Sequence, residues 1–234
     1  MKSIFLSATI FVAATLSSAI AADSTNGVVP ATDSNLDPAI EKKAGDWVAS
    51  LNLGDAAKAA RVTQAVAEHL QAVRDWHNGH SYTNVPAGIN PATGRPLSAL
   101  DREMIVDSTI PASVHKNLMT ALRKDLTEDQ VAAILDKYTI GKVAFTMKGY
   151  EVIVPDLTAD EKTTILKNLS QAREEAIDYK NIKEISSIFE IYKTKNEQFL
   201  NSNGRNWHEL YKAYVNKIKA EKAAAAEAKK AESK

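Results

Sequence analysis

The sequence contains no cysteine. This absence excludes disulfides, thiolate-ligated zinc, iron–sulfur clusters, c-type haem attachment and a lipoprotein anchor on cysteine. Because no disulfide can cross-link the fold, the protein must be stabilised by a packed core. A chain of 234 residues, 44% of them hydrophobic, is long and apolar enough to build such a core in one domain or two.

The chain also has no excess of charge of either sign. It carries 29 basic and 29 acidic residues, for a formal net charge of +0. A neutral chain exerts no broad attraction on nucleic acid or on an anionic membrane. We therefore expect no nucleic-acid partner.

Long apolar runs are absent except at the N-terminus, where residues 1–22 have the pattern of a signal peptide. Lys2 precedes an apolar stretch over residues 4–16, and small residues at Ala19 and Ala21 form a cleavage site. An uncleaved membrane anchor is the alternative, but the run is shorter than the roughly 20 residues that a spanning helix needs. We expect an exported protein, periplasmic or extracellular, with no membrane span after cleavage.

Composition divides the remaining chain into three parts. Residues 23–36 are rich in Ser, Thr, Gly and Asp and are predicted to be a flexible N-terminus. Residues 37–218 form the predicted helical domain. Residues 219–234 contain only Ala, Lys, Glu and one Ser, which favours a solvated helical extension because nothing large and apolar is available to bury.

Apolar residues recur at helical spacing through most of the predicted domain, as in Val62, Val66, Leu70 and Val73. Residues that favour helix starts precede these stripes, namely Asp37, Asp55, Ser98, Pro111, Thr127 and Thr158. The predicted fold is all-α or nearly so, a helical bundle of six to eight helices with one long ordered loop.

The helical pattern is interrupted over residues 139–155. Strand-forming side chains gather there around Gly149, including Val143, Phe145, Tyr150 and Val152. This composition favours a small β-hairpin or an extended segment, and the sequence leaves both open.

The loop over residues 79–97 holds three of the seven prolines and three of the nine glycines. A long loop without periodicity is usually either functional or disordered. Its apolar residues, among them Tyr82, Val85, Ile89 and Leu97, favour a loop that is ordered, packs on the bundle and forms one wall of a pocket.

Two histidines at the start of this loop are candidate metal ligands. His77 and His80 are three residues apart, a spacing that one helical turn brings together. Gly79 lies between them and weakens that geometry, and His77 also falls on the apolar stripe, where a core histidine is the alternative. We expect no cofactor, with a divalent metal as the open alternative.

The same region has the composition of a carbohydrate site. Sugars bind to aromatic platforms flanked by amides and planar donors. The candidate ligand-binding residues are Trp76, His77, His80, Tyr82, Asn90, Arg95 and His115.

Catalytic signatures are sparse. The adjacent carboxylates of Glu128 and Asp129, and of Glu174 and Glu175, point apart on a helix, and no serine has a nucleophile-elbow context. The sequence names no catalytic residue and favours a binding protein over an enzyme.

Several segments of the C-terminal half together resemble a known family. They are Leu126–Val131, Asp136–Val143, Gly149–Tyr150, Val154–Thr158, Ala172–Ala176, Ile188–Lys193 and Leu200–Gly204. These runs are similar to a bacterial family of exported proteins with a domain of unknown function, and the similarity covers most of the chain after residues 1–22, closely from about Pro111 and more loosely from Trp76. The resemblance implies a helical exported protein that binds sugar and is encoded near polysaccharide-degrading enzymes. It supplies no catalytic residue. A weaker similarity, carried by Leu126–Gln130, is to helical periplasmic stress chaperones.

The leading hypothesis is therefore an exported binding or accessory protein with an oligosaccharide or polysaccharide ligand. A metal-assisted hydrolase or lyase acting on polysaccharide is one alternative, and a periplasmic chaperone-like helical protein is another. The oligomeric state stays open.

Overall fold

The computed structural model describes residues 36–91 and 93–232, and the predicted signal peptide and flexible N-terminus lie outside this part except for residue 36. Within the described residues the fold is all-α, with nine α-helices, one 3-10 turn and no strand. The predicted fold class is confirmed. The helices are α1 (Pro38–Ala49), α2 (Ala56–Gly79), α3 (Ala99–Asp107), α4 (Ala112–Asp125), α5 (Glu128–Thr139), α6 (Lys142–Ile153), α7 (Ala159–Ala176), α8 (Ile182–Ser202) and α9 (Trp207–Glu232), with the 3-10 turn η1 (Tyr82–Asn84) between α2 and α3.

Local capping chemistry sets most of the helix starts. Asp37 accepts a hydrogen bond from the backbone of Ala39 at the start of α1, and Asp55 does the same from Lys58 in α2. Ser98 closes a reciprocal capping box at α3. These side chains satisfy amides that have no partner inside the helix, so the predicted starts at these positions are confirmed.

Neither the hairpin nor the extended segment considered for residues 139–155 is present, because residues 142–153 form α6. Val143, Met147 and Tyr150 are buried at helical spacing, whereas Phe145 is 80% exposed on another face. Packing of this apolar stripe outweighs the strand propensity of the individual side chains. Gly141, in the left-handed region at φ +65°, separates α5 from α6. With this segment the described residues contain nine helices, where six to eight were predicted.

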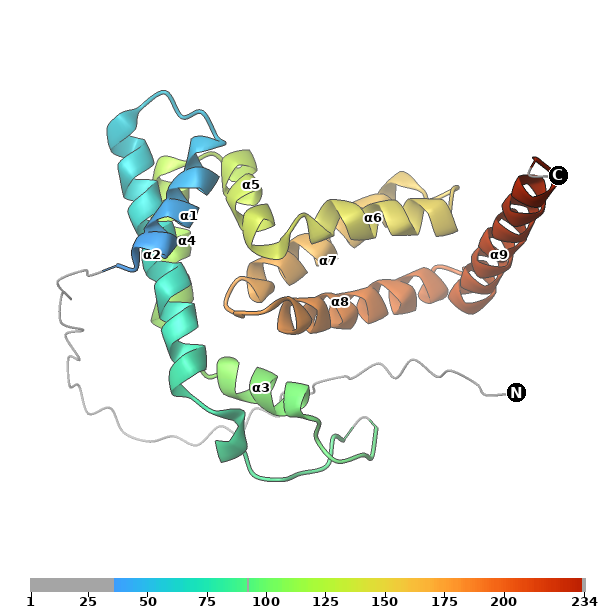
Figure 1. Ribbon diagram of the computed structural model, residues 1–234, viewed down its shortest axis with the longest axis horizontal. Helices are drawn as coiled ribbons and strands as arrows, with labels where there is room; N and C mark the ends of the chain where they lie inside the picture. The colour runs from blue at the N-terminus through green and yellow to red at the C-terminus, as the bar shows by residue number, and fades with distance from the viewer. Residues whose placement is uncertain (1–35, 92, 233–234) are drawn as a thin grey trace. The chain divides into compact units, whose positions relative to one another are not determined.

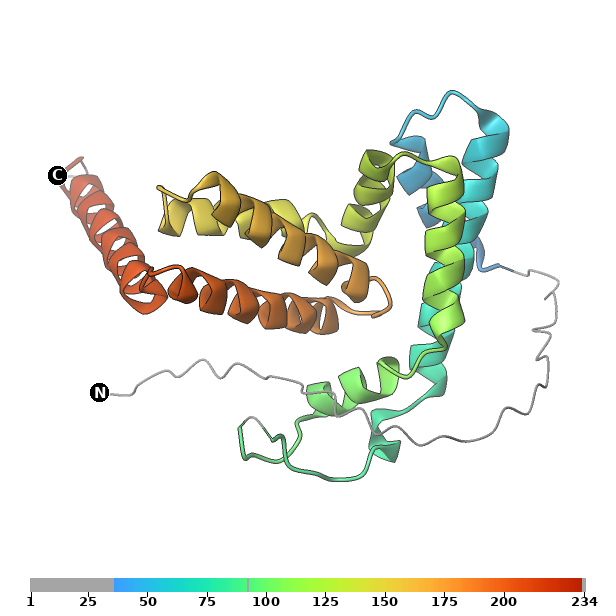
Figure 2. The same cartoon turned by 180° about the vertical axis from the view of Figure 1, so that it is seen from behind.

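The helices divide into two compact units. The first comprises described residues up to 134 together with Asp178–Glu184, which is the connection between α7 and α8 and the first turn of α8. Within it, α1 and α4 pack against α2, as both views show (Figures 1 and 2). The core of this unit is apolar and fully buried, and includes Val48, Val62, Val66, Leu118 and Leu122.

The second unit contains Leu135–Ile177 and the chain from Ile185 onward. Its helix α6 packs on α7 and contacts α9, and its core includes Ile165, Leu169 and Leu200. A buried amide pair, in which Asn168 Nδ2 donates to Asn196 Oδ1 at 2.7 Å, links α7 to α8. The helix α9 continues through the Ala/Lys/Glu segment, where residues 219–228 are exposed.

None of the helices in residues 36–91 and 93–232 combines the length and the hydropathy needed to cross a membrane.

Candidate functional site

The C-terminal end of α2 rests on the end of α3 through two consecutive side chains. Trp76 Nε1 donates to the carbonyl of Val106 at 3.3 Å, and His77 Nδ1 lies 2.6 Å from Oδ2 of Asp107. The indole of Trp76 and the imidazole of His77 thus bond to two adjacent residues of α3, Val106 and Asp107. The helix α2 that carries both side chains packs against α1 and α4.

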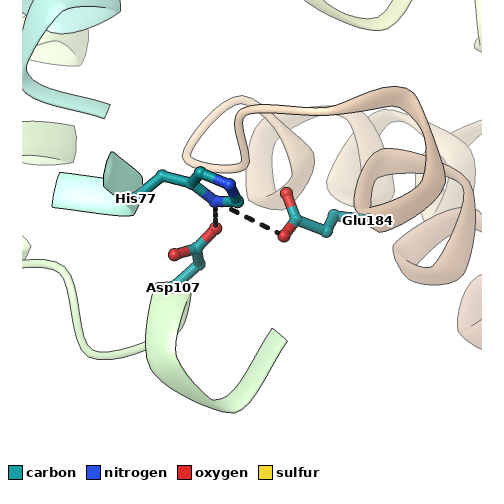
Figure 3. Close-up of side chains that lie close together, drawn as sticks. All are labelled: His77, Asp107 and Glu184. Carbon is teal, nitrogen blue, oxygen red and sulfur yellow. Dashed lines mark hydrogen bonds and ion pairs between the residues drawn. The ribbon is translucent and has the colours of Figure 1, made fainter. Parts of the chain in front are cut away.

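Glu184 completes a cluster that we call the His77 triad: His77, Asp107 and Glu184. Figure 3 shows the three side chains pointing toward one another, from the end of α2, the end of α3 and the start of α8. Oε1 of Glu184 lies 3.7 Å from His77 Nδ1. The backbone N–H of Asn181 donates to the other oxygen, Oε2, at 3.2 Å. Glu184 is therefore held by the same local chemistry that caps α8.

The two carboxylates of the triad are buried. Glu184 is 0% exposed and Asp107 is 3% exposed, whereas the side chain of His77 reaches the surface. Burial and the nearby charge of Asp107 raise the pKa of Glu184 to about 7. The buried site therefore favours the protonated form of this carboxyl more than water does.

The donor atoms of the triad all lie within 4.8 Å of one another. One imidazole nitrogen and two carboxylate oxygens form a set that can hold a divalent cation. Without a cation, a carboxyl with a pKa near neutrality can give or take a proton. The arrangement is thus chemically competent for either role.

His80, the partner that the sequence pairs with His77 for a metal, lies in a different environment. Its ring stacks on Trp76 with centroids 3.8 Å apart, and its Nδ1 lies 2.8 Å from the carbonyl oxygen of Trp76. The structure gathers two carboxylates around His77 and places His80 on the indole. The stack is partly open, since Trp76 is half-buried and His80 is exposed.

Tyr82, Asn90 and Arg95 belong to the loop that follows. The guanidinium of Arg102 lies 5.6 Å from the ring centroid of Tyr82 and donates to the carbonyls of Thr83 and Val85, which ties η1 to α3. Asn90 is buried, and its backbone N–H donates to the carbonyl of Arg95 at 2.8 Å. This turn is thus closed by its own backbone.

His115 pairs with an acid that sequence reasoning did not connect to it. Its Nδ1 lies 2.8 Å from Oδ2 of Asp178, whose Oδ1 lies 3.0 Å from Nε2 of the buried His69. Burial acts to raise the pKa of Asp178, but hydrogen bonds from His115 and His69 outweigh it and leave that pKa lowered. The carboxylate therefore stays ionised between two imidazoles.

Sequence reasoning singled out His77 and His115 but missed His69 and the acids that these histidines contact. A local signal existed for Asp107, which is the last residue of α3, where the helix dipole disfavours a carboxylate. Glu184 gave no such signal, because an acid three residues after Asn181 is ordinary capping chemistry.

A shallow hollow of about 170 Å³ lies elsewhere on the first unit, between α2 and α4. Its walls include Glu68, His69 and Asn117, and small side chains such as Ala65 and Ala72 leave the space. Among the predicted ligand-binding residues, none lines this hollow in the described part of the chain.

The sequence model of a family described as "Protein of unknown function (DUF3826)" matches residues 38–220. The chain belongs to the DUF3826 family. The DUF3826 match spans α1 to α8 and about the first half of α9, so it includes both units. It confirms the resemblance to a family with a domain of unknown function. Curated proteins gave no match.

Proposed function

We propose that this protein is an exported binding or accessory protein that takes a carbohydrate ligand at the C-terminal end of α2. The observation that carries the proposal is the stacked Trp76–His80 pair directly beside the His77 triad. An apolar ring face thus lies next to hydrogen-bonding groups on consecutive residues.

The chemistry of sugars suits such a surface. The C–H face of a pyranose packs on an aromatic ring, while its hydroxyl groups need charged or planar hydrogen-bonding partners. The half-buried indole of Trp76 and the exposed imidazole of His80 supply the ring. The imidazole of His77 and the guanidinium of Arg102, held near Tyr82, supply polar groups on the same unit.

Preorganisation also supports the proposal. Trp76 is fixed by its bond to Val106, His80 by its stacking, and η1 by Arg102. Groups that are already held in place lose little conformational entropy when a ligand binds.

The test is a glycan array followed by calorimetry with plant-type oligosaccharides on the full chain. We expect Trp76→Ala to abolish binding and the matched control Trp47→Ala, on α1 of the same unit, to retain it. Circular dichroism would verify that both variants keep the helical content of the parent. The absence of binding to any glycan, or equal binding by the parent and Trp76→Ala, would refute the proposal.

The second candidate is a hydrolase or lyase acting on polysaccharide, and the observation favouring it is the buried carboxyl pair of the triad. A carboxyl with a pKa of about 7 is suited to general acid or base catalysis. Release of reducing ends or of unsaturated products from polysaccharides, lost in Glu184→Gln, would support this function. Turnover unchanged in that variant would contradict it.

A further inference from the structure

We propose that His77, Asp107 and Glu184 bind one divalent transition-metal ion, with Zn²⁺ as the first candidate. The proposal goes beyond carbohydrate binding and depends on none of it, because it rests on the triad alone.

The first argument is the state of Glu184. Its side chain is completely buried, and its Oε1 has no hydrogen-bond partner among the described residues. A buried carboxylate oxygen without a partner is costly, and native proteins seldom leave one. This oxygen points into the triad, toward His77 (Figure 3). A bound cation would satisfy it.

The second argument is the charge of the cluster. In the described part of the chain, His77 is the one basic side chain that forms an ion pair with either Asp107 or Glu184. Lys180, on the connection just before α8, instead donates to the amide oxygen of Asn78. Two buried carboxylates thus share one imidazole. A divalent ion bound to a neutral imidazole and two carboxylates would balance the charge.

The third argument is distance. Donor atoms at about 2.0–2.2 Å from one tetrahedral metal ion lie roughly 3.4 Å apart. The separations of 2.6 Å from His77 to Asp107 and 3.7 Å from His77 to Glu184 bracket that value. All three donor atoms lie within 4.8 Å of one another, so side-chain movements of about 1 Å would seat the ion, which would replace the hydrogen bond between His77 and Asp107.

The donor set decides the class of metal. Imidazole favours Zn²⁺, Fe²⁺, Ni²⁺ or Cu²⁺, whereas Ca²⁺ and Mg²⁺ prefer oxygen ligands alone. Two carboxylates and one imidazole therefore favour Zn²⁺, with Mn²⁺ the nearest oxygen-preferring competitor. Three protein ligands leave at least one position for water or for an oxygen of a ligand.

The experiment is calorimetric titration of ZnCl2 into full-length protein that has been treated with EDTA and dialysed. We expect one saturable site. Glu184→Gln and Asp107→Asn should each weaken Zn²⁺ binding by more than tenfold, since loss of even an outer hydrogen-bond partner costs about tenfold to a hundredfold at metal sites. Calcium should bind much more weakly than zinc.

Two controls separate this site from adventitious binding. His208→Ala removes an exposed histidine on α9, and Asp178→Asn removes the acid of the other histidine cluster, so both should keep the parent's affinity. Should either triad variant fail to fold, X-ray absorption spectroscopy of the zinc-loaded parent tests the proposal directly. The spectrum should show one imidazole ligand, with oxygen atoms as the other ligands of the zinc ion. Absence of a saturable site, unchanged affinity in a folded Glu184→Gln, or a shell with two or more imidazoles would overturn the proposal. Sugar binding can fail or succeed independently of each result.

Discussion

Replacing Glu184 with Gln should stabilise the metal-free protein above neutral pH, although it removes a buried charged residue. Gln keeps the shape of the side chain and can still accept the hydrogen bond from the backbone of Asn181. It removes the negative charge that burial and Asp107 make unfavourable. Both elements that face Glu184, α2 with His77 and α3 with Asp107, remain unchanged.

The expected magnitude follows from the pKa. Burial, together with Asp107, raises the pKa of Glu184 to about 7, above the ordinary value of 4.5. The folded state holds the proton of Glu184 more tightly than the unfolded state does. The stabilisation that this protonated carboxyl contributes is therefore fully present below pH 4.5. It is lost as the pH rises through 7. The difference between the two pKa values corresponds to at most about 3 kcal/mol.

Thermal unfolding in EDTA at pH 5 and pH 8 measures the effect. At pH 8 the Tm of Glu184→Gln should exceed that of the parent by roughly 5–10 °C, given about 2–4 °C per kcal/mol for a protein of this size. At pH 5 the two should nearly coincide. Glu227→Gln, an isosteric change in the exposed part of α9, should have no effect at either pH. A Glu184→Gln protein that is less stable than the parent at pH 8 would show that the carboxylate is well solvated or paired, and would refute the reasoning.

Other substitutions probe the second unit. Arg205→Ala should lower the free energy of unfolding, measured in urea, by about 3 kcal/mol. The reason is that buried Glu161 loses a guanidinium that donates to both of its carboxylate oxygens. A loss below about 0.5 kcal/mol would contradict a buried ion pair. The hydrogen bond from Arg205 lowers the pKa of Glu161 to about 2, so the parent should lose this stabilisation as pH falls from 4.5 toward 2, and acid titration of Arg205→Ala should show a shallower decline. Gly141→Ala should cost about 1–2 kcal/mol in thermal melts, because φ is +65° there. Gly149→Ala should instead add about 0.5–1 kcal/mol, because it lies inside α6 with open space around the new methyl group; the same sign for both substitutions would show that backbone conformation does not distinguish them.

Most of the helix starts could be predicted because their chemistry is local. A cap such as Asp55 or Ser98 bonds to an amide within three residues, so the relevant partners are adjacent in the sequence. The segment of α6 could not be predicted in this way, since Val143 and Tyr150 favour strands when taken singly. These side chains form an apolar stripe only when they are buried together on one face of a helix. That burial depends on α7 and α9, which pack against α6.

The sequence by itself determined the all-α class, the lack of any thiol chemistry and the region in which candidate ligand residues gather. Tertiary structure decided which of them act together. Asp107 lies 30 residues from His77, and Glu184 lies far beyond both, so no spacing rule joins them. They meet because the ends of α2 and α3 and the start of α8 are brought to one place by burial of apolar side chains, a non-directional force whose result depends on the whole fold.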